Sequence, residues 1–122
     1  MRGDAARRAD IEDLFRPFGP VTIKRMFGGY GIYVDGLMFA LETGGEIYLK
    51  TDSESLPRFE ARGLKPFAFD SRRGRMTTSY RLLPEEARDD ETELRTWAAL
   101  ALETARRVAA GKKAKKKPEK PR

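Results

Sequence analysis

The residues that could carry out acid–base or nucleophilic chemistry here are carboxylates, lysines, serines and tyrosines, because the 122 residues include no histidine and no cysteine. Zinc sites of the usual kind and Ser-His-Asp or Cys-His nucleophiles are therefore excluded. The paired carboxylates Glu85-Glu86 and Asp89-Asp90 fall close to the expected beginning of a helix, where such charges are ordinary stabilisers. We therefore expect a binding protein rather than an enzyme, with no metal and no cofactor.

Positively charged side chains could also bind a ligand, and the excess of positive charge is concentrated at the C-terminal end of the chain. The formal net charge is +6. Residues 111–122 hold seven of the 25 basic residues but one of the 19 acidic ones, which leaves residues 1–110 formally neutral. The segment has two prolines and no large apolar residue, which predicts a disordered tail. Its lysines could neutralise nucleic-acid phosphates or could merely solubilise the chain, and both interpretations stay open for Lys112, Lys113, Lys115, Lys116, Lys117 and Lys120.

Three arginines, Arg72, Arg73 and Arg75, lie between two predicted strands, so we expect them at the tip of a hairpin loop. Such a tip could lie along the backbone of DNA or RNA, as the wing of a winged domain does. Lys24 and Arg25 could extend that patch. A solvated polar loop is the interpretation we favour, because a neutral body offers no broad positive field to support the contact.

Aromatic side chains could add stacking to a nucleic-acid contact. Tyr33, Tyr48, Tyr80 and Trp97 could each stack on a base. Aromatic residues within strands are more often core or cross-strand partners, and we favour that interpretation here.

The most unusual stretch is Met26-Phe27-Gly28-Gly29-Tyr30-Gly31, in which three of four consecutive positions are glycine. Glycine lets the backbone bend sharply or approach another group closely. A phosphate-binding loop would open a helix and be followed by Lys-Ser or Lys-Thr, whereas this stretch leads into a strand. We therefore favour a bulge or bend that re-aims the strand.

The elements that must position these residues follow from hydrophobic spacing and turn signals. Apolar residues at helical spacing predict a helix over 5–16. Asp35-Gly36 and Gly44-Gly45 each separate two apolar runs, which predicts two consecutive tight hairpins. The remaining expected elements are a short helix through 59–62 capped by Asp52 or Ser53, a helix over 91–110 ended by Gly111, and strands at 21–26, 30–34, 37–41, 46–50, 66–69 and 76–83.

The predicted order is α-β-β-β-β-α-β-β-α, with hairpins in place of crossover helices. Hairpins imply an antiparallel sheet with helices on one face, which is a two-layer α+β sandwich. The length fits a single domain over 1–110, followed by the tail 111–122. No apolar run approaches the ~20 residues of a membrane helix, and the charged beginning is unlike a secretory signal, so we expect a cytoplasmic protein.

The run Arg25-Met26-Phe27-Gly28-Gly29-Tyr30-Gly31-Ile32-Tyr33-Val34-Asp35-Gly36 closely resembles the signature of the TfoX N-terminal domain family, the TfoX/Sxy regulators of bacterial competence. The resemblance extends over about residues 10–108. It continues through Met38-Phe39-Ala40-Leu41, Glu46-Ile47-Tyr48-Leu49-Lys50, Phe59-Glu60-Ala61-Arg62-Gly63-Leu64, Pro66-Phe67, Ser79-Tyr80-Arg81-Leu82-Leu83-Pro84 and the helix that carries Trp97.

The resemblance implies a fold similar to that of secretion chaperones and a part in transcriptional activation of DNA-uptake genes. Sxy-type proteins act there together with a cyclic-AMP receptor protein at promoters. Full-length family members carry a helical C-terminal domain after the first, so this chain resembles a stand-alone N-terminal domain. The family supplies no catalytic residues to transfer.

Two functions follow as hypotheses. In the first, a regulatory module binds nucleic acid weakly and without sequence preference through its basic tail, while the sheet or the last helix contacts a protein partner. In the second, the domain is a chaperone-like homodimer or peptide-binding module with no role on DNA.

Overall fold

The computed structural model describes residues 3–26 and 28–116 as a sheet packed against helices. The predicted order α-β-β-β-β-α-β-β-α is confirmed, with an additional short 3₁₀ helix before the last α-helix. The elements are α1 (Asp4–Phe15), β1 (Thr22–Met26), β2 (Gly29–Val34), β3 (Leu37–Thr43), β4 (Glu46–Lys50), α2 (Leu56–Ala61), β5 (Pro66–Ser71), β6 (Gly74–Leu82), η1 (Glu85–Arg88) and α3 (Glu91–Lys116).

The six strands form one antiparallel sheet in the order β1-β2-β3-β4-β6-β5. Both predicted tight turns are present. Asp35 and Gly36 have φ of 53° and 77°, and Gly44 and Gly45 have φ of 58° and 87°, so all four residues lie in the left-handed region that such turns require. These two turns place β2, β3 and β4 side by side with little freedom in register.

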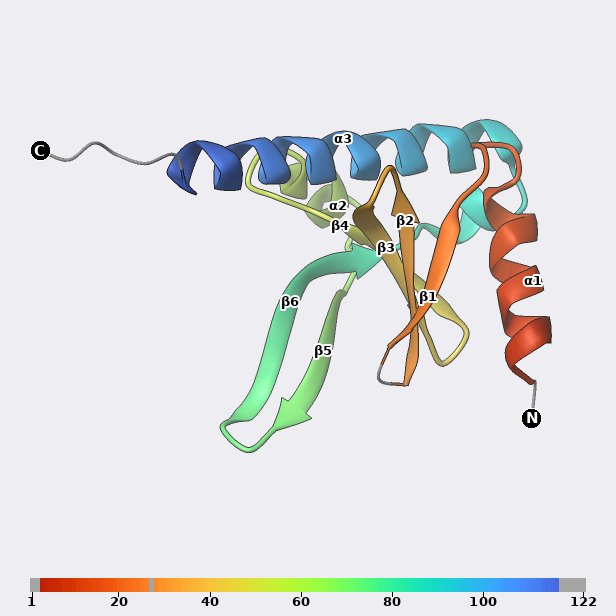
Figure 1. Ribbon diagram of the computed structural model, residues 1–122, viewed down its shortest axis with the longest axis horizontal. Coiled ribbons are helices and arrows are strands. Elements are labelled where there is room, and N and C mark those ends of the chain that lie inside the picture. Colours follow the sequence, from red (N-terminus) through yellow and green to blue (C-terminus); the bar gives the residue numbers. More distant parts are fainter. Residues whose placement is uncertain (1–2, 27, 117–122) are drawn as a thin grey trace, which may run out of the picture.

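The core lies between the sheet and the helices, as a two-layer α+β sandwich requires. Figure 1 shows α3 running across the upper ends of β1 to β4, with α1 at the end of the molecule nearest β1. One stripe of α3 is buried against strand residues, and Trp97 packs edge-on against Phe59 of α2 with ring centres 5.0 Å apart. The buried core includes Phe15, Ile32, Phe39, Ile47, Leu49, Phe59, Leu94, Trp97, Ala98, Ala101 and Leu102.

The β5–β6 hairpin projects from the body, and its tip differs from the predicted loop. It is joined to β4 through three residue pairs near its base, and Figure 1 shows its far end standing clear of the other strands. The strands continue to Ser71 and resume at Gly74, so the turn consists of Arg72 and Arg73 alone. Arg75 lies within β6 opposite Asp70, not at the tip, because the strand pairing extends further than the polar composition suggested.

The last helix also differs from its predicted end. It continues through Gly111 to Lys116, so residues 111–116 of the expected disordered tail are helical. Gly111 has no positive φ, and a glycine inside a helix lowers its stability by only about 1 kcal/mol without ending it. The lysines and the alanine that follow are good helix formers, and cations are favourable at a helix C-terminus. Residues 117–122 lie outside the described part of the chain.

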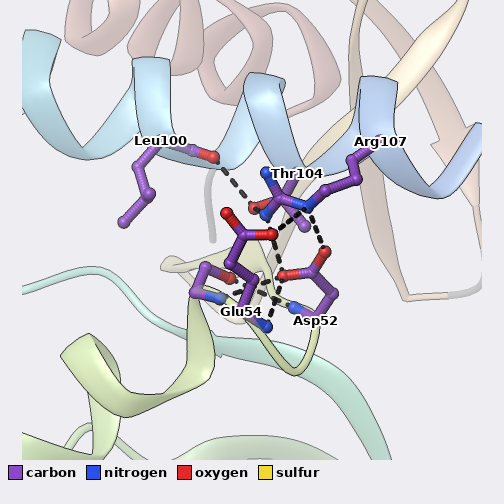
Figure 2. Close-up of polar contacts among 6 residues, drawn as sticks. Asp52, Glu54, Leu100, Thr104 and Arg107 are labelled. Carbon is purple, nitrogen blue, oxygen red and sulfur yellow. Dashed lines mark hydrogen bonds and ion pairs between the residues drawn. The ribbon is translucent and has the colours of Figure 1, made fainter.

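A bidentate ion pair joins the C-terminal half of α3 to the segment between β4 and α2. Arg107 donates from Nε and Nη2 to the two carboxylate oxygens of Asp52, at 2.7 and 2.9 Å (Figure 2). Asp52 Oδ1 also accepts hydrogen bonds from the backbone N–H groups of Glu54 and Ser55, in the turn that leads into α2. Hydrogen bonds from Arg107 and Ser55 hold the pKa of the Asp52 carboxyl well below its usual range. A single side chain thus joins the end of β4, the start of α2 and α3.

We expect Asp52→Ala to lower the free energy of unfolding by about 2 kcal/mol at neutral pH, because it removes a turn cap and a charge-assisted pair together. The contribution of Asp52 is present above the unfolded carboxyl pKa of about 4 and is lost as the pH falls below it. Urea unfolding from pH 7 down to about pH 1.5 measures both effects, and the difference between the two proteins should narrow only well below pH 4, as the pH approaches the lowered pKa of the folded state.

The matched control is Asp13→Ala, since Asp13 pairs with Arg16 and both side chains are largely exposed. Exposed pairs of this kind contribute less than about 1 kcal/mol. Equal losses of stability in the two variants would contradict the role given to Asp52.

Candidate functional site

The basic residues singled out in the sequence do not form one patch in the described part of the chain. Arg72 and Arg73 lie at the hairpin tip, far from the C-terminal end of α3 in Figure 1. Arg75 is paired with Asp70 at 3.0 Å, and Arg25 lies 3.7 Å from an oxygen of Asp4. Two of the five candidate cations of the body are therefore already partnered by carboxylates.

The tail lysines are divided by the end of the described structure. Lys112 is an exposed residue of α3. The backbone at Lys113, Lys115 and Lys116 continues the same helix. Lys117 and Lys120 lie outside the described residues.

The glycines of the Met26–Gly31 stretch lie at a sharp turn and at positions of close packing, so the predicted bulge or bend takes the form of a hairpin turn. Gly28 has φ of 67° in the turn between β1 and β2. A side chain at Gly29 would place its Cβ 1.9 Å from the backbone oxygen of Glu42. At Gly31 a Cβ would meet the sulfur atoms of Met26 and Met38 at 3.0 Å. The register shift in these strands lies between Ile32 and Tyr33, beyond the glycines.

Tyr30, the aromatic residue of that stretch, ties β2 to α1. Its hydroxyl donates to Asp4, and that hydrogen bond is the main reason why the pKa of Tyr30 is raised. The guanidinium groups of Arg7 and Arg8 lie 4.9 and 5.4 Å from its ring centre, and Arg7 pairs with the buried Glu42 at 2.6 Å. These contacts give Tyr30 a structural role in holding α1 against β2.

A cavity of about 340 Å³ lies where the C-terminal part of α3 meets the sheet. Lys50 and Tyr80 are direct cross-strand partners on β4 and β6, and the Lys50 ammonium lies 4.9 Å from the Tyr80 ring centre. On β1 and β2, Lys24 lies over Tyr33 at 4.8 Å. The cavity is lined by Tyr33, Gly36, Leu37, Met38, Lys50, Tyr80, Ala105, Val108, Ala109 and Lys112.

The electrostatics of this lysine–tyrosine cavity are unbalanced. Burial and the neighbouring Lys112 lower the pKa of Lys50, and the Asp52 carboxylate acts in the opposite direction. Both oxygens of Asp52 are already bound by Arg107, however. Burial and then the nearby Tyr33 raise the pKa of Tyr80 to about 12, so its hydroxyl stays a hydrogen-bond donor at neutral pH. The described residues that line the cavity therefore supply two ammonium groups and two phenolic hydroxyls and include no carboxylate.

The sequence pattern did not identify this cavity, because Lys50 and Lys112 are 62 positions apart. One feature of the sequence does point to the cavity. Ala105, Val108, Ala109 and Lys112 fall at helical spacing, so they share one face of α3, and two of them are small enough to leave space beside the sheet. The Tyr33 and Tyr80 side chains that were weighed for base stacking lie at this cavity, whereas Trp97 is part of the core.

The comparison with known families agrees with the motif and with the order of elements. A family model described as the TfoX N-terminal domain matches residues 13–105, from the second half of α1 to the middle of α3. The chain belongs to the TfoX N-terminal domain family. This confirms the resemblance carried by the glycine-rich signature. No curated protein matches this TfoX N-terminal domain.

The described residues of the TfoX domain show neither a metal-binding cluster nor a membrane-spanning helix. Residues 3–26 and 28–116 contain no group of three or more acidic side chains that could hold a metal ion. Within the same ranges, none of the helices has the length and apolar character that crossing a membrane demands.

We expect Gly29→Ala to lower the free energy of unfolding by at least about 3 kcal/mol, because the new methyl group collides with backbone that cannot rotate away. The matched control is Gly111→Ala, where no atom lies within 4 Å of the added carbon and helix propensity predicts a gain of about 0.5–1 kcal/mol. Thermal unfolding followed by circular dichroism measures both. A Gly29→Ala domain as stable as the parent would show that the close approach of β2 and β3 is not a constraint.

Proposed function

We propose that this TfoX N-terminal domain is a regulatory binding module that associates with nucleic acid through the basic end of α3 and performs no catalysis. The observation that carries the proposal is the continuation of α3 to Lys116. Figure 1 shows the last turns of that helix extending beyond the sheet and α2. The helix backbone at 113–116 is thereby carried away from a body whose own formal charges balance.

The charge distribution supports binding without sequence preference. Residues 1–110 are formally neutral, whereas residues 111–122 carry the whole net charge of +6. Lysines that replace counterions around phosphates gain affinity through the released salt ions and read no bases. The domain would then need a second component to reach a particular promoter.

That second component is a protein partner in this proposal. Family membership points to regulation of competence and DNA uptake, and the resemblance implies a transcription factor of the cyclic-AMP receptor type as the partner. The domain would contribute weak phosphate contacts to a complex whose sequence reading is done by the transcription factor. A cytoplasmic location belongs to the same proposal.

Substituting Lys113, Lys115, Lys116, Lys117 and Lys120 together by Gln tests the nucleic-acid contact. If these five lysines each neutralise one phosphate, the log–log dependence of DNA affinity on salt should have a slope of about −4.5 in the parent and near zero in the variant. The parent should lose about 500-fold in affinity between 50 and 200 mM salt. Fluorescence anisotropy with a labelled duplex measures both slopes.

The control is Arg72→Gln combined with Arg73→Gln, which removes two charges from the hairpin tip and leaves α3 intact. This variant should keep the slope and the affinity of the parent. Unchanged binding in the five-lysine variant, or a larger loss in the arginine variant, would refute the role of the α3 end.

A second candidate function, a chaperone-like homodimer, is favoured by one observation on the sheet. Phe69 and Met76 face each other on β5 and β6 and are 44% and 41% exposed. Met26, across the sheet, is 37% exposed. Large apolar side chains exposed on one element are typical of contact surfaces, and methionine adapts readily to different partners.

Sedimentation over a range of protein concentrations tests this candidate. A dimer held by the hairpin should dissociate at higher concentration when Phe69→Ser and Met76→Ser are combined. The control Thr77→Ala, on the opposite face of β6, should leave the equilibrium unchanged. A parent chain that stays monomeric at every concentration would eliminate the homodimer.

A further inference from the structure

We propose that the lysine–tyrosine cavity binds a small organic phosphate, a phosphate monoester with an apolar or aromatic body. This site is separate from the α3 end proposed to contact nucleic acid. It goes beyond that function because its ligand is a free small molecule.

The first step of the argument is charge. Lys50 and Lys112 both line the cavity, and burial first and then Lys112 lower the pKa of Lys50. Asp52 acts on Lys50 in the opposite direction, but both of its carboxylate oxygens are bound by Arg107. An anion placed between the two lysines would offset the effect of Lys112 on Lys50. A phosphate monoester carries close to two negative charges at neutral pH and therefore matches two lysines better than a carboxylate does.

The second step is hydrogen bonding. Tyr80 and Tyr33 lie at the same cavity, and each ring already has a lysine against it. The high pKa of Tyr80 keeps its phenol protonated at neutral pH. Phenols and ammonium groups are donors that suit the three terminal oxygens of a phosphate, and hydrogen bonds to a charged acceptor are the stronger kind.

The third step is size and lining. The cavity of about 340 Å³ lies at the lower end of the roughly 300–1,000 Å³ range of small-molecule sites, and it is larger than a phosphate group alone would fill. Half of the lining residues are apolar side chains. They are Leu37, Met38, Ala105, Val108 and Ala109, which could contact the organic part of the ester.

The fourth step is how the fold keeps the space open. Ala105 and Ala109 present a short side chain where a leucine would reach the sheet. The Asp52–Arg107 pair holds this part of α3 in place (Figure 2). Apart from Gly36 in the turn between β2 and β3, the residues that line the cavity belong to strands and to α3.

Phenyl phosphate, inorganic phosphate and benzyl alcohol are suitable probes for the whole chain, with binding followed by calorimetry and by amide shifts in NMR. We expect phenyl phosphate to bind saturably, more tightly than either other probe, with shifts concentrated at residues 105–112 of α3 and at Lys50. Lys50→Met should weaken phenyl phosphate binding about tenfold, the loss of one charge-assisted hydrogen bond. Lys65→Met, which removes an exposed lysine before β5, should leave it unchanged.

Ala109→Leu separates the cavity from a general attraction to positive charge, because it fills the space and keeps every lysine. It should abolish the phenyl phosphate signal while thermal unfolding shows a folded domain. Loss of binding in both lysine variants alike, or full binding by Ala109→Leu, would overturn the proposal. So would equal affinity for inorganic phosphate, which would leave no role for the apolar lining residues.

The same variants keep this proposal apart from the nucleic-acid function. Lys50→Met should retain the DNA affinity and salt slope of the parent, and the five-lysine variant should retain phenyl phosphate binding. A Lys50→Met chain that lost DNA binding to the same extent as phenyl phosphate would show one shared anion surface and overturn the separate site.

Discussion

The position of α3 depends on the bidentate pair between Arg107 and Asp52. Apolar burial presses the first half of this helix onto the sheet through Leu94, Trp97 and Ala101, but the second half has mainly alanines facing the strands. Small side chains give little directional preference, so ion pairs contribute more to the placement of this half, and among the described residues the Arg107–Asp52 pair is the one with bidentate geometry. The cavity and the basic end both belong to that second half and follow from its path.

Local chemistry explains why most of the fold could be predicted from the sequence. The turns at Asp35-Gly36 and Gly44-Gly45 require backbone conformations that few other residues adopt. These residues therefore identify the turns whatever the rest of the sequence is. The end of α3 was placed wrongly because a glycine is weak evidence for a helix end when good helix formers follow it. Arg75 was assigned to the turn because polar composition does not reveal how far two strands continue to pair.

The two candidate sites also differ in how far the sequence alone reveals them. A lysine-rich segment is visible in composition, whereas the cavity brings together β2, β3, β4, β6 and α3 and has no sequence signature. Cross-strand pairing puts Lys50 beside Tyr80, and only the docking of α3 adds Lys112. The glycine-rich signature, the most distinctive stretch of the sequence, has a packing role. Gly29 allows the backbone of Glu42 to approach closely, and Tyr30 is hydrogen-bonded to Asp4 of α1. The stretch that identifies the family is therefore not where the unbalanced charge lies.

The way the β5–β6 hairpin is attached affects which parts of this domain can change in sequence during evolution. Three residue pairs connect the hairpin to β4, and its outer half contributes no side chain to the buried core. An element so weakly coupled to the rest can open locally without global unfolding. Substitutions at its outer positions should scarcely change the stability of the body, in contrast to those in β2 and β3. The outer half of the β5–β6 hairpin is thus a region where new binding specificities can evolve with little loss of folding stability.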